Sequence, residues 1–221
     1  MKLMLGALAK FTLGLAMVGA LLFLPAGSIR YPNAWLFIGL LFLPMLILGI
    51  VLLIKAPALL QKRLDAKEDE NTQKGVVAAS GLLFLVGFTV AGLDFRFGWS
   101  YVPTWVVITA SVVLLVSYAL YAEVMRENAY LSRKIEIQEN QTVIDTGLYG
   151  IVRHPMYAVT VWLFLAIPVV LGSWWSLLCF APYVVIIAFR ISNEEKVLEA
   201  GLDGYAEYKQ RVKYRLIPFV W

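Results

Sequence analysis

Cysteine and histidine are almost absent from this sequence, which contains one of each. The single cysteine, Cys179, has no partner within the chain, so an intrachain disulfide is excluded. One histidine and one cysteine are also too few for a zinc site built from nitrogen and sulfur ligands, and no metal is expected. Charged residues are scarce as well, at 15% of the chain, whereas 61% of the residues are hydrophobic. Soluble domains contain only about 45–50% apolar residues, so an integral membrane protein is predicted.

Long hydrophobic runs are present instead. Four runs reach the roughly 17–20 residues that a transmembrane helix needs, and they cover residues 5–25, 34–54, 76–93 and 103–122. A fifth apolar block, residues 156–189, is too long for one span and long enough for two short ones. Gly172 and Ser173 lie at its middle, where a tight turn is most easily made. The predicted fold is an all-α integral membrane protein of about six transmembrane helices, the last two forming a short helical hairpin.

Positive charges are distributed unevenly between the two sides that six spans would define. Both termini and the loops at residues 55–75 and 123–155 would share one side, which carries all 19 Lys and Arg residues except Arg30 and Arg96. Basic loops mark the cytoplasmic side of membrane proteins, so both termini and a C-terminal helix are predicted to be cytoplasmic. The same bias explains the net charge of +4, and no nucleic-acid partner is expected.

Polar residues are concentrated in two predicted cytoplasmic blocks, residues 141–157 before the hairpin and residues 190–221 after it. Charge is nearly absent inside the predicted spans, which counts against a pump or a proton-coupled carrier. Because a hairpin brings its own ends together, the two blocks are expected to meet. The chain is interpreted as one membrane domain, residues 1–221, with four variable helices in residues 1–125 and a cofactor-binding region in residues 126–221.

The first polar block contains a predicted helix start with basic residues beside it. Pro155 suits the first turn of a helix, and the free N–H groups and positive dipole end of that helix form a natural anion site. Arg153 and His154 stand next to this site. An ordinary interfacial helix start with a snorkelling arginine explains these residues equally well.

The second polar block begins with an arginine and two glutamates. If the last helix of the hairpin continues, Arg190 and Glu194 are i and i+4 and share a face, and Glu195 lies about 100° away. Taken alone, an ordinary ion pair on a solvated helix end is the simpler explanation. The two blocks together bring a basic cluster and an acidic pair to the ends of one hairpin. S-Adenosylmethionine would suit this arrangement, because it carries a carboxylate, an ammonium and a sulfonium.

The same residues resemble the signature of the isoprenylcysteine carboxyl methyltransferases and of the related membrane phospholipid N-methyltransferases. The similarity extends from residue 141 to the C-terminus. It consists of GLYGIVRHPMY at residues 147–157, the pair Glu194 and Glu195, and YAEYKQRVKYRLIP at residues 205–218. The first four predicted helices show no recognisable motif, as expected if they vary with the substrate.

The resemblance implies a membrane methyltransferase that depends on S-adenosylmethionine. Its acceptor would be lipophilic, for example an isoprenylcysteine carboxylate or a lipid, and would enter from the bilayer. Glu194 is expected to hold the cofactor and Arg190 to lie near the acceptor, and these two are the expected catalytic residues. Cofactor contacts are expected from both motifs and from the neighbouring charged residues, namely Gln141, Thr142, Val143, Ile144, Tyr149, Arg153, His154, Pro155, Met156, Tyr157, Glu194 and Glu195.

The sequence departs from the family pattern at two places. Ala158 and Val159 stand where a small residue usually follows the motif tyrosine, and Gln141 stands where histidine is usual. Two other interpretations stay open at this point. A membrane enzyme of the steroid reductase type would use NADPH, whereas a carrier or an assembly factor without enzymatic activity would tolerate changes at His154 and Glu194.

Overall fold

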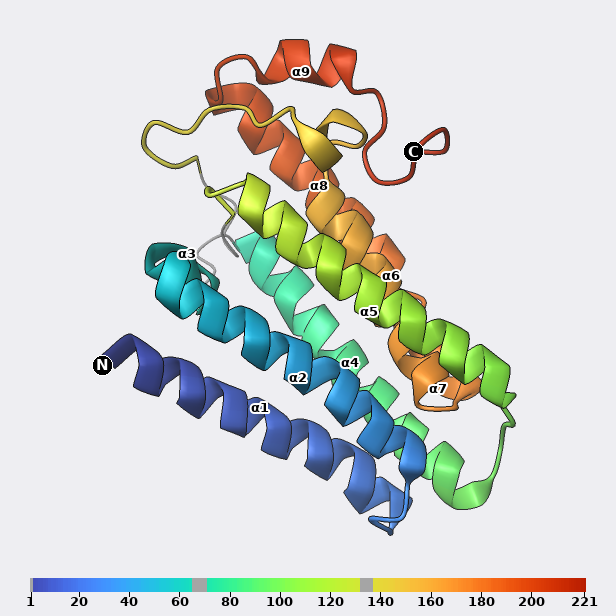
Figure 1. The fold of residues 1–221 in the computed structure, drawn as a ribbon. Coiled ribbons are helices and arrows are strands. Elements are labelled where there is room, and N and C mark those ends of the chain that lie inside the picture. The colour runs from blue at the N-terminus through green and yellow to red at the C-terminus, as the bar shows by residue number, and fades with distance from the viewer. Residues whose placement is uncertain (1, 65–70, 132–136) are drawn as a thin grey trace.

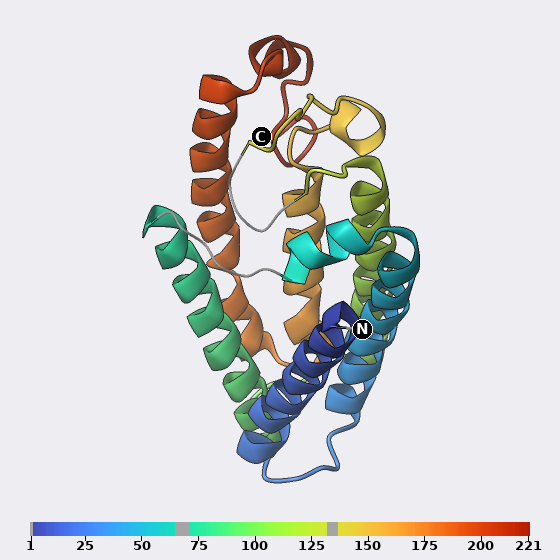
Figure 2. The same cartoon turned by 90° about the vertical axis from the view of Figure 1, so that its left-hand side faces the viewer.

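The computed structural model describes residues 2–64, 71–131 and 137–221, and helices form the regular structure of these residues. The first half contains four long helices and one short one, namely α1 (Lys2–Ala26), α2 (Pro32–Lys55), α3 (Pro57–Leu64), α4 (Asn71–Phe97) and α5 (Thr104–Glu127). The second half contains the 3-10 helix η1 (Gly147–Gly150) and the α-helices α6 (Pro155–Val170), α7 (Trp174–Phe180), α8 (Tyr183–Gly201) and α9 (Tyr205–Arg211). The long helices form an elongated bundle (Figures 1 and 2).

Five helices of the described chain are long and apolar enough to cross a membrane. They are α1, α2, α4, α5 and the combined helix that α7 and α8 form, Trp174–Gly201. The four predicted apolar runs coincide with α1, α2, α4 and α5, apart from residue 103 just before α5, and the fifth block covers α6, α7 and the first part of α8. The all-helical membrane fold is therefore confirmed. Helix α6 has 16 residues, and at about 1.5 Å per residue it is shorter than the roughly 30 Å of the hydrocarbon core. The count of six spans therefore stays a prediction.

Large apolar side chains cover the outside of the bundle. Leu13, Leu24 and Trp105, for example, are 70%, 77% and 70% exposed. Exposed apolar surface on this scale is unfavourable in water and marks a surface that lipid or another protein covers. Exposed aromatic residues occur where α4 passes into α5 and α6 into α7, which is typical of a membrane–water interface; they include Trp99, Tyr101, Trp105, Trp174 and Trp175.

Two glycines of α4 allow close helix packing. A Cβ atom at Gly92 would lie 2.6 Å from the backbone oxygen of Leu22 in α1, and one at Gly87 would lie 2.3 Å from the ring of Phe180 in α7. A larger residue at either position would push these helices apart, because real Cβ atoms do not approach other atoms so closely. Helix α4 thereby connects the N-terminal helices to the hairpin.

The hairpin turns at the predicted position. Gly172 has a positive φ of 79°, and the hydroxyl of Ser173 caps α7 by accepting a hydrogen bond from Ser176 N at 3.0 Å. The returning arm differs from a simple span, because Ala181 and Pro182 separate α7 from α8. Helix α8 then continues beyond the apolar block to Gly201, so the second polar block begins on a helix, as expected.

The connection predicted as a loop at residues 55–75 contains a helix, α3. Its residues Leu59 and Leu60 are buried, and Leu59 belongs to an apolar cluster with Val124 and Met125 of α5. Burial of this apolar face stabilises a helix that is too short to be stable alone. Figure 1 shows α9 and the C-terminus together at one end of the bundle.

Candidate functional site

A cavity of about 490 Å³ lies where the two polar blocks meet. Its wall comes from α3, α4, α6, α8, α9, η1 and the segments around residues 128–131 and 141–144. Most of the predicted site residues line it, namely Gln141, Thr142, Val143, Ile144, Tyr149, Arg153, His154, Met156, Tyr157, Arg190 and Glu194. Pro155 and Glu195 are not part of its wall. The hairpin therefore brings residues from both sequence blocks to one cavity.

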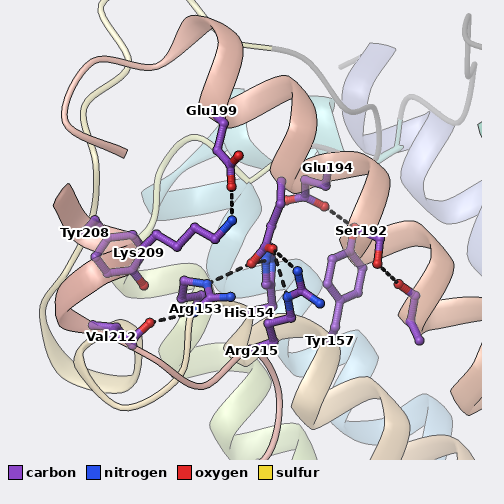
Figure 3. A network of polar contacts seen from close by, with 12 residues as sticks. Arg153, His154, Tyr157, Ser192, Glu194, Glu199, Tyr208, Lys209, Val212 and Arg215 are labelled. Carbon is purple, nitrogen blue, oxygen red and sulfur yellow. Dashed lines mark hydrogen bonds and ion pairs between the residues drawn. The ribbon is translucent and has the colours of Figure 1, made fainter. Parts of the chain in front are cut away.

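Glu195 is the centre of a buried ion cluster. Its partners Arg153, His154 and Arg215 lie close together in Figure 3. Its carboxylate accepts a hydrogen bond from Arg153 Nε at 2.8 Å and another from Arg215 Nε at 2.9 Å. The Nε2 atom of His154 lies 3.2 Å from the same carboxylate. The side chains of Arg153 and Glu195 are only 4% and 3% exposed, and a buried charge of this kind requires such partners. Arg153, His154 and Glu195 thus contact one another, and a cofactor contact of Glu195 stays a prediction.

Arg153 also attaches the C-terminal tail to the start of α6. Its guanidinium donates to the backbone oxygens of Val212 at 2.7 Å and Lys213 at 2.8 Å. The backbone N–H groups of Arg153 and His154 donate to the next two carbonyls of the tail, those of Tyr214 and Arg215, each at 2.9 Å. The basic residues beside the helix start therefore bind groups of the chain itself, the Glu195 carboxylate and the tail backbone.

Tyr157 connects the two expected catalytic residues. Its hydroxyl donates to Glu194 Oε2 at 2.5 Å and accepts from Arg190 Nε at 2.9 Å. Arg190 and Glu194 lie one turn apart on α8, as the i and i+4 spacing predicted, and the tyrosine of α6 bridges them. Hydrogen bonds to charged groups are short and comparatively strong. The two hydrogen bonds of Tyr157 therefore hold the side chains of Arg190 and Glu194 in fixed positions at the cavity wall.

The 3-10 helix η1 positions Tyr149. Gly147 has a positive φ of 50°, and a Cβ atom there would lie 1.9 Å from Oε1 of Glu127. That carboxylate, at the end of α5, accepts from Leu148 N at 3.2 Å and so satisfies an N–H group at the start of η1. The Tyr149 hydroxyl in turn accepts from Nδ2 of Asn128 at 2.9 Å. Gly147 is therefore required by both backbone conformation and space.

Three tyrosines of the cavity wall remain protonated at physiological pH. Burial raises the pKa of Tyr149, although the hydrogen bond from Asn128 acts in the opposite direction. Burial also raises the pKa of Tyr208 and that of Tyr205, and for Tyr205 the nearby glutamates act in the same direction. These phenols are therefore neutral hydrogen-bonding groups and not bases.

Several wall residues were not predicted as site residues. Four of them are polar or aromatic, namely Arg63 of α3, Asn128 directly after α5, and Tyr205 and Tyr208 of α9. Tyr205 and Tyr208 belong to the C-terminal part of the family signature, and their i and i+3 spacing, which puts both on one face of a helix, was the available signal. Helix α4 adds an unpredicted apolar part of the wall, with Val76, Val77, Gly81 and Phe84. Among the described residues, no three His, Cys, Asp or Glu side chains are grouped so as to hold a metal ion.

Both the sequence and the structure are similar to known membrane methyltransferases. Residues 105–202 match the family model of the phospholipid methyltransferases. No curated protein matches the sequence significantly. Among solved structures, the eukaryotic intramembrane Ras methyltransferase, an isoprenylcysteine carboxyl methyltransferase, is similar with a TM-score of 0.56 and 17% identity. The match covers 97% of this chain and 77% of that one. The resemblance predicted from the motifs is therefore confirmed: this chain has the fold of an intramembrane methyltransferase, and its residues 105–202 match the phospholipid methyltransferase family.

Proposed function

We propose that this protein transfers a methyl group from S-adenosylmethionine to a lipophilic acceptor that enters from the membrane. The family match and the fold support a membrane methyltransferase. The observation that carries the more specific proposal is the hydrogen-bonded chain from Arg190 through Tyr157 to Glu194. It places both signs of charge in a cavity whose wall is otherwise largely apolar, and this suits a charged cofactor beside an apolar acceptor.

The residues of the cavity fit the proposed cofactor. Its volume of about 490 Å³ is within the roughly 300–1,000 Å³ of small-molecule sites. Glu194 and Arg190 offer partners for an ammonium and a carboxylate. Tyr149, His154, Tyr157 and Glu194 are the side chains that would hold the cofactor.

The proposed reaction depends mainly on positioning. When bound, S-adenosylmethionine supplies an electrophilic methyl carbon, and transfer breaks its bond to sulfur, with the electron pair passing to sulfur. Glu194 places a negative charge close to the cationic cofactor, and Tyr157 prevents that carboxylate from rotating away. Arg190 would orient the polar end of the acceptor, so that its nucleophilic atom approaches in line. A carboxylate or thiolate acceptor needs no base, whereas an amine acceptor loses a proton that Glu194 could take.

The cofactor part of the proposal is tested by calorimetry on the purified protein in detergent. Wild-type protein is expected to bind S-adenosylmethionine and its demethylated product S-adenosylhomocysteine. Glu194→Gln should weaken this binding at least tenfold without changing the thermal unfolding temperature of the unliganded protein, because the glutamine keeps a hydrogen bond to Tyr157. The matched control is Glu123→Gln, an exposed residue of α5 that pairs with Arg126 and should leave the affinity unchanged.

The absence of any calorimetric signal with wild-type protein would disprove the proposal. Saturable binding of NADPH in its place would identify an enzyme of the steroid reductase type. Unchanged binding in Glu194→Gln would remove this residue from the cofactor site.

The acceptor part of the proposal concerns the apolar wall formed by α4. A Cβ atom at Gly81 meets no atom within 4 Å, so Gly81→Phe adds a ring to the cavity without disturbing the helix. Transfer of a labelled methyl group to the lipid extract of membranes should fall at least tenfold, while the affinity for S-adenosylhomocysteine should not change. Gly39→Phe is the control, because Gly39 is exposed on α2 and also has open space around it. Equal transfer by both variants would place the acceptor elsewhere.

A further inference from the structure

Residues 216–221, the C-terminal hook, form a turn that is closed by its own backbone. The N–H groups of Leu216 and Ile217 both donate to the carbonyl oxygen of Trp221, at 2.8 Å and 3.0 Å. The N–H groups of Val220 and Trp221 donate to Ile217 O, each at 3.1 Å. The hook therefore satisfies these backbone groups within itself.

The hook lies where helix α8 changes from apolar to charged. Leu216 is buried in a cluster with Ile187 and Ile191 of α8, and Trp221 packs against the same cluster. On α8, Phe189 is 70% exposed, and charged residues begin directly after it. Figures 1 and 2 show the chain turning back from α9 toward the bundle before it ends. An exposed apolar helix surface that gives way to charged residues marks the boundary between bilayer and water, so the hook lies at this boundary.

Three apolar side chains of the hook are directed away from the protein. Ile217, Phe219 and Val220 are 39%, 86% and 75% exposed. Phe219 also has a positive φ of 64°, a conformation that is unfavourable for a bulky residue and is more usual for glycine or asparagine. An exposed aromatic ring is thus present where a small residue would fit the backbone better. Adjacent exposed apolar side chains of this kind mark a surface that another molecule covers.

Basic residues stand beside these apolar side chains. Residues 208–221 contain no acidic residue and four basic ones, namely Lys209, Arg211, Lys213 and Arg215. Lys213 is exposed, and no carboxylate of the described residues pairs with it. Apolar and aromatic side chains next to exposed basic ones are typical of segments that bind anionic lipid headgroups. The charge of the tail therefore favours a lipid surface as the covering molecule.

We propose that the C-terminal hook docks on the anionic lipid surface of the leaflet next to the cavity. Ile217, Phe219 and Val220 insert among the lipid headgroups, and Lys213 lies close to the phosphates. Docking holds the tail against the start of α6, where Arg153 binds its backbone. The proposal does not depend on the proposed function, since it uses only the hook, the tail and the end of α8.

Spin labels on single cysteines test this proposal in the full chain, reconstituted into nanodiscs of phosphatidylcholine and phosphatidylglycerol. In a Cys179→Ser background, one label is attached at Val220→Cys. Phe189→Cys on α8 is the bilayer reference, and Glu207→Cys on α9 is the water reference. Electron paramagnetic resonance measures collisions of each label with oxygen, which partitions into lipid, and with a water-soluble nickel complex. We expect the oxygen-to-nickel ratio at Val220→Cys to be several-fold higher than at Glu207→Cys.

Phe219→Asn is the matched variant, because asparagine keeps the positive φ and removes the apolar ring. It should lower the ratio at Val220→Cys toward that at Glu207→Cys, without changing the thermal unfolding temperature in detergent. Omission of phosphatidylglycerol should lower the ratio as well, and an unchanged ratio would overturn the anionic character of the surface.

Two results with the unaltered hook would overturn the proposal as a whole. One is a label at Val220→Cys that meets the nickel complex as often as the label at Glu207→Cys, since the hook would then lie in water. The other is a label hidden from both oxygen and nickel, which would show that protein, such as a second copy of this chain, covers the hook.

Discussion

At the scale of single residues, two adjacent glutamates have different surroundings. Glu195 is 2% exposed and is held by Arg153 and Arg215 outside the cavity wall. Glu194 points into the cavity and is bound by Tyr157. The difference follows from helix geometry, because consecutive residues are about 100° apart around the axis. Two acids that are adjacent in the sequence therefore have different roles: Glu195 stabilises the tail, and Glu194 is available to a ligand.

Arg153→Ala should destabilise the protein strongly. The substitution removes one hydrogen-bonding cation from the buried carboxylate of Glu195, and it leaves the backbone oxygens of Val212 and Lys213 without the guanidinium. Removal of one partner from a buried ion pair lowers the free energy of unfolding by about 3–5 kcal/mol. Thermal unfolding in detergent should show the loss, together with faster proteolysis of the residues after α9. Arg126→Ala is the control: its ion pair with Glu123 is exposed, and no measurable change is expected. An unchanged unfolding temperature for Arg153→Ala would contradict the role of the cluster.

Gly147→Ala should disturb η1 and the cavity wall together. A left-handed backbone costs a non-glycine residue about 1–2 kcal/mol, and the new Cβ atom would collide with Glu127. We expect lower stability and, under the proposed function, weaker binding of S-adenosylhomocysteine, because η1 positions Tyr149. Gly39→Ala, in open space within α2, should be neutral or slightly stabilising. Equal behaviour of the two variants in thermal unfolding would refute this explanation of Gly147.

At the scale of elements, the hairpin is fastened at the end opposite the cavity. The buried carboxylate of Asp94 in α4 accepts from Ser100 N at 2.8 Å and from the hydroxyl of Ser173 in the turn. The hydroxyl of Tyr31 donates to Leu171 O, at the end of α6, at 2.6 Å. The turn between α6 and α7 is thus hydrogen-bonded to the N-terminal helices, which fixes how far the hairpin can move relative to α4.

Ser173→Ala should weaken this connection. It removes the cap of α7, worth about 0.5–2 kcal/mol, and takes one hydrogen-bond donor from Asp94. The thermal unfolding temperature should fall accordingly. Ser111→Ala is a suitable control, because the Ser111 hydroxyl donates only to Val107 O of its own helix and its loss should have little effect. If both variants unfold at the same temperature, Ser173 does not hold the turn.

At the scale of the whole molecule, the candidate site lies at one end of an apolar bundle. The C-terminus and α9 lie at that same end (Figures 1 and 2), whereas the start of α1 lies nearer the middle of the molecule in Figure 2. The exposed aromatic residues near Tyr101 and Trp174 lie at the other end. We expect the end with the cavity to face the cytoplasm, because nearly all basic residues outside the spans belong to it. The cofactor would then be reached from the cytoplasm and the acceptor from the bilayer.

Labelling of single cysteines in intact cells tests this orientation. In a Cys179→Ser background, Tyr101→Cys, at a position that is 80% exposed, should react with a membrane-impermeant thiol reagent. Glu207→Cys, at an exposed position of α9, should react only after the cells are permeabilised. The opposite pattern would reverse the predicted orientation.

The positions of the long helices could be predicted from the sequence, because the thickness of the bilayer sets the length of an apolar run and a helix satisfies its own backbone. The turn at Gly172 and the motif residues of the cavity could also be predicted, because each depends on residues that are close together in the sequence. Helix α3 was not predicted, because its two buried leucines are stabilised by contacts with α5.

The sequence by itself determined the class of fold, the uneven charge and the family resemblance. Only the tertiary structure decided which partners the polar residues take. It separated Glu194 from Glu195, inserted Tyr157 between Arg190 and Glu194, and left the hydroxyl of Tyr205 without a partner among the described residues. These relations depend on how α6, α8 and α9 are rotated and packed against one another, and packing between helices is set by contacts between residues far apart in the chain.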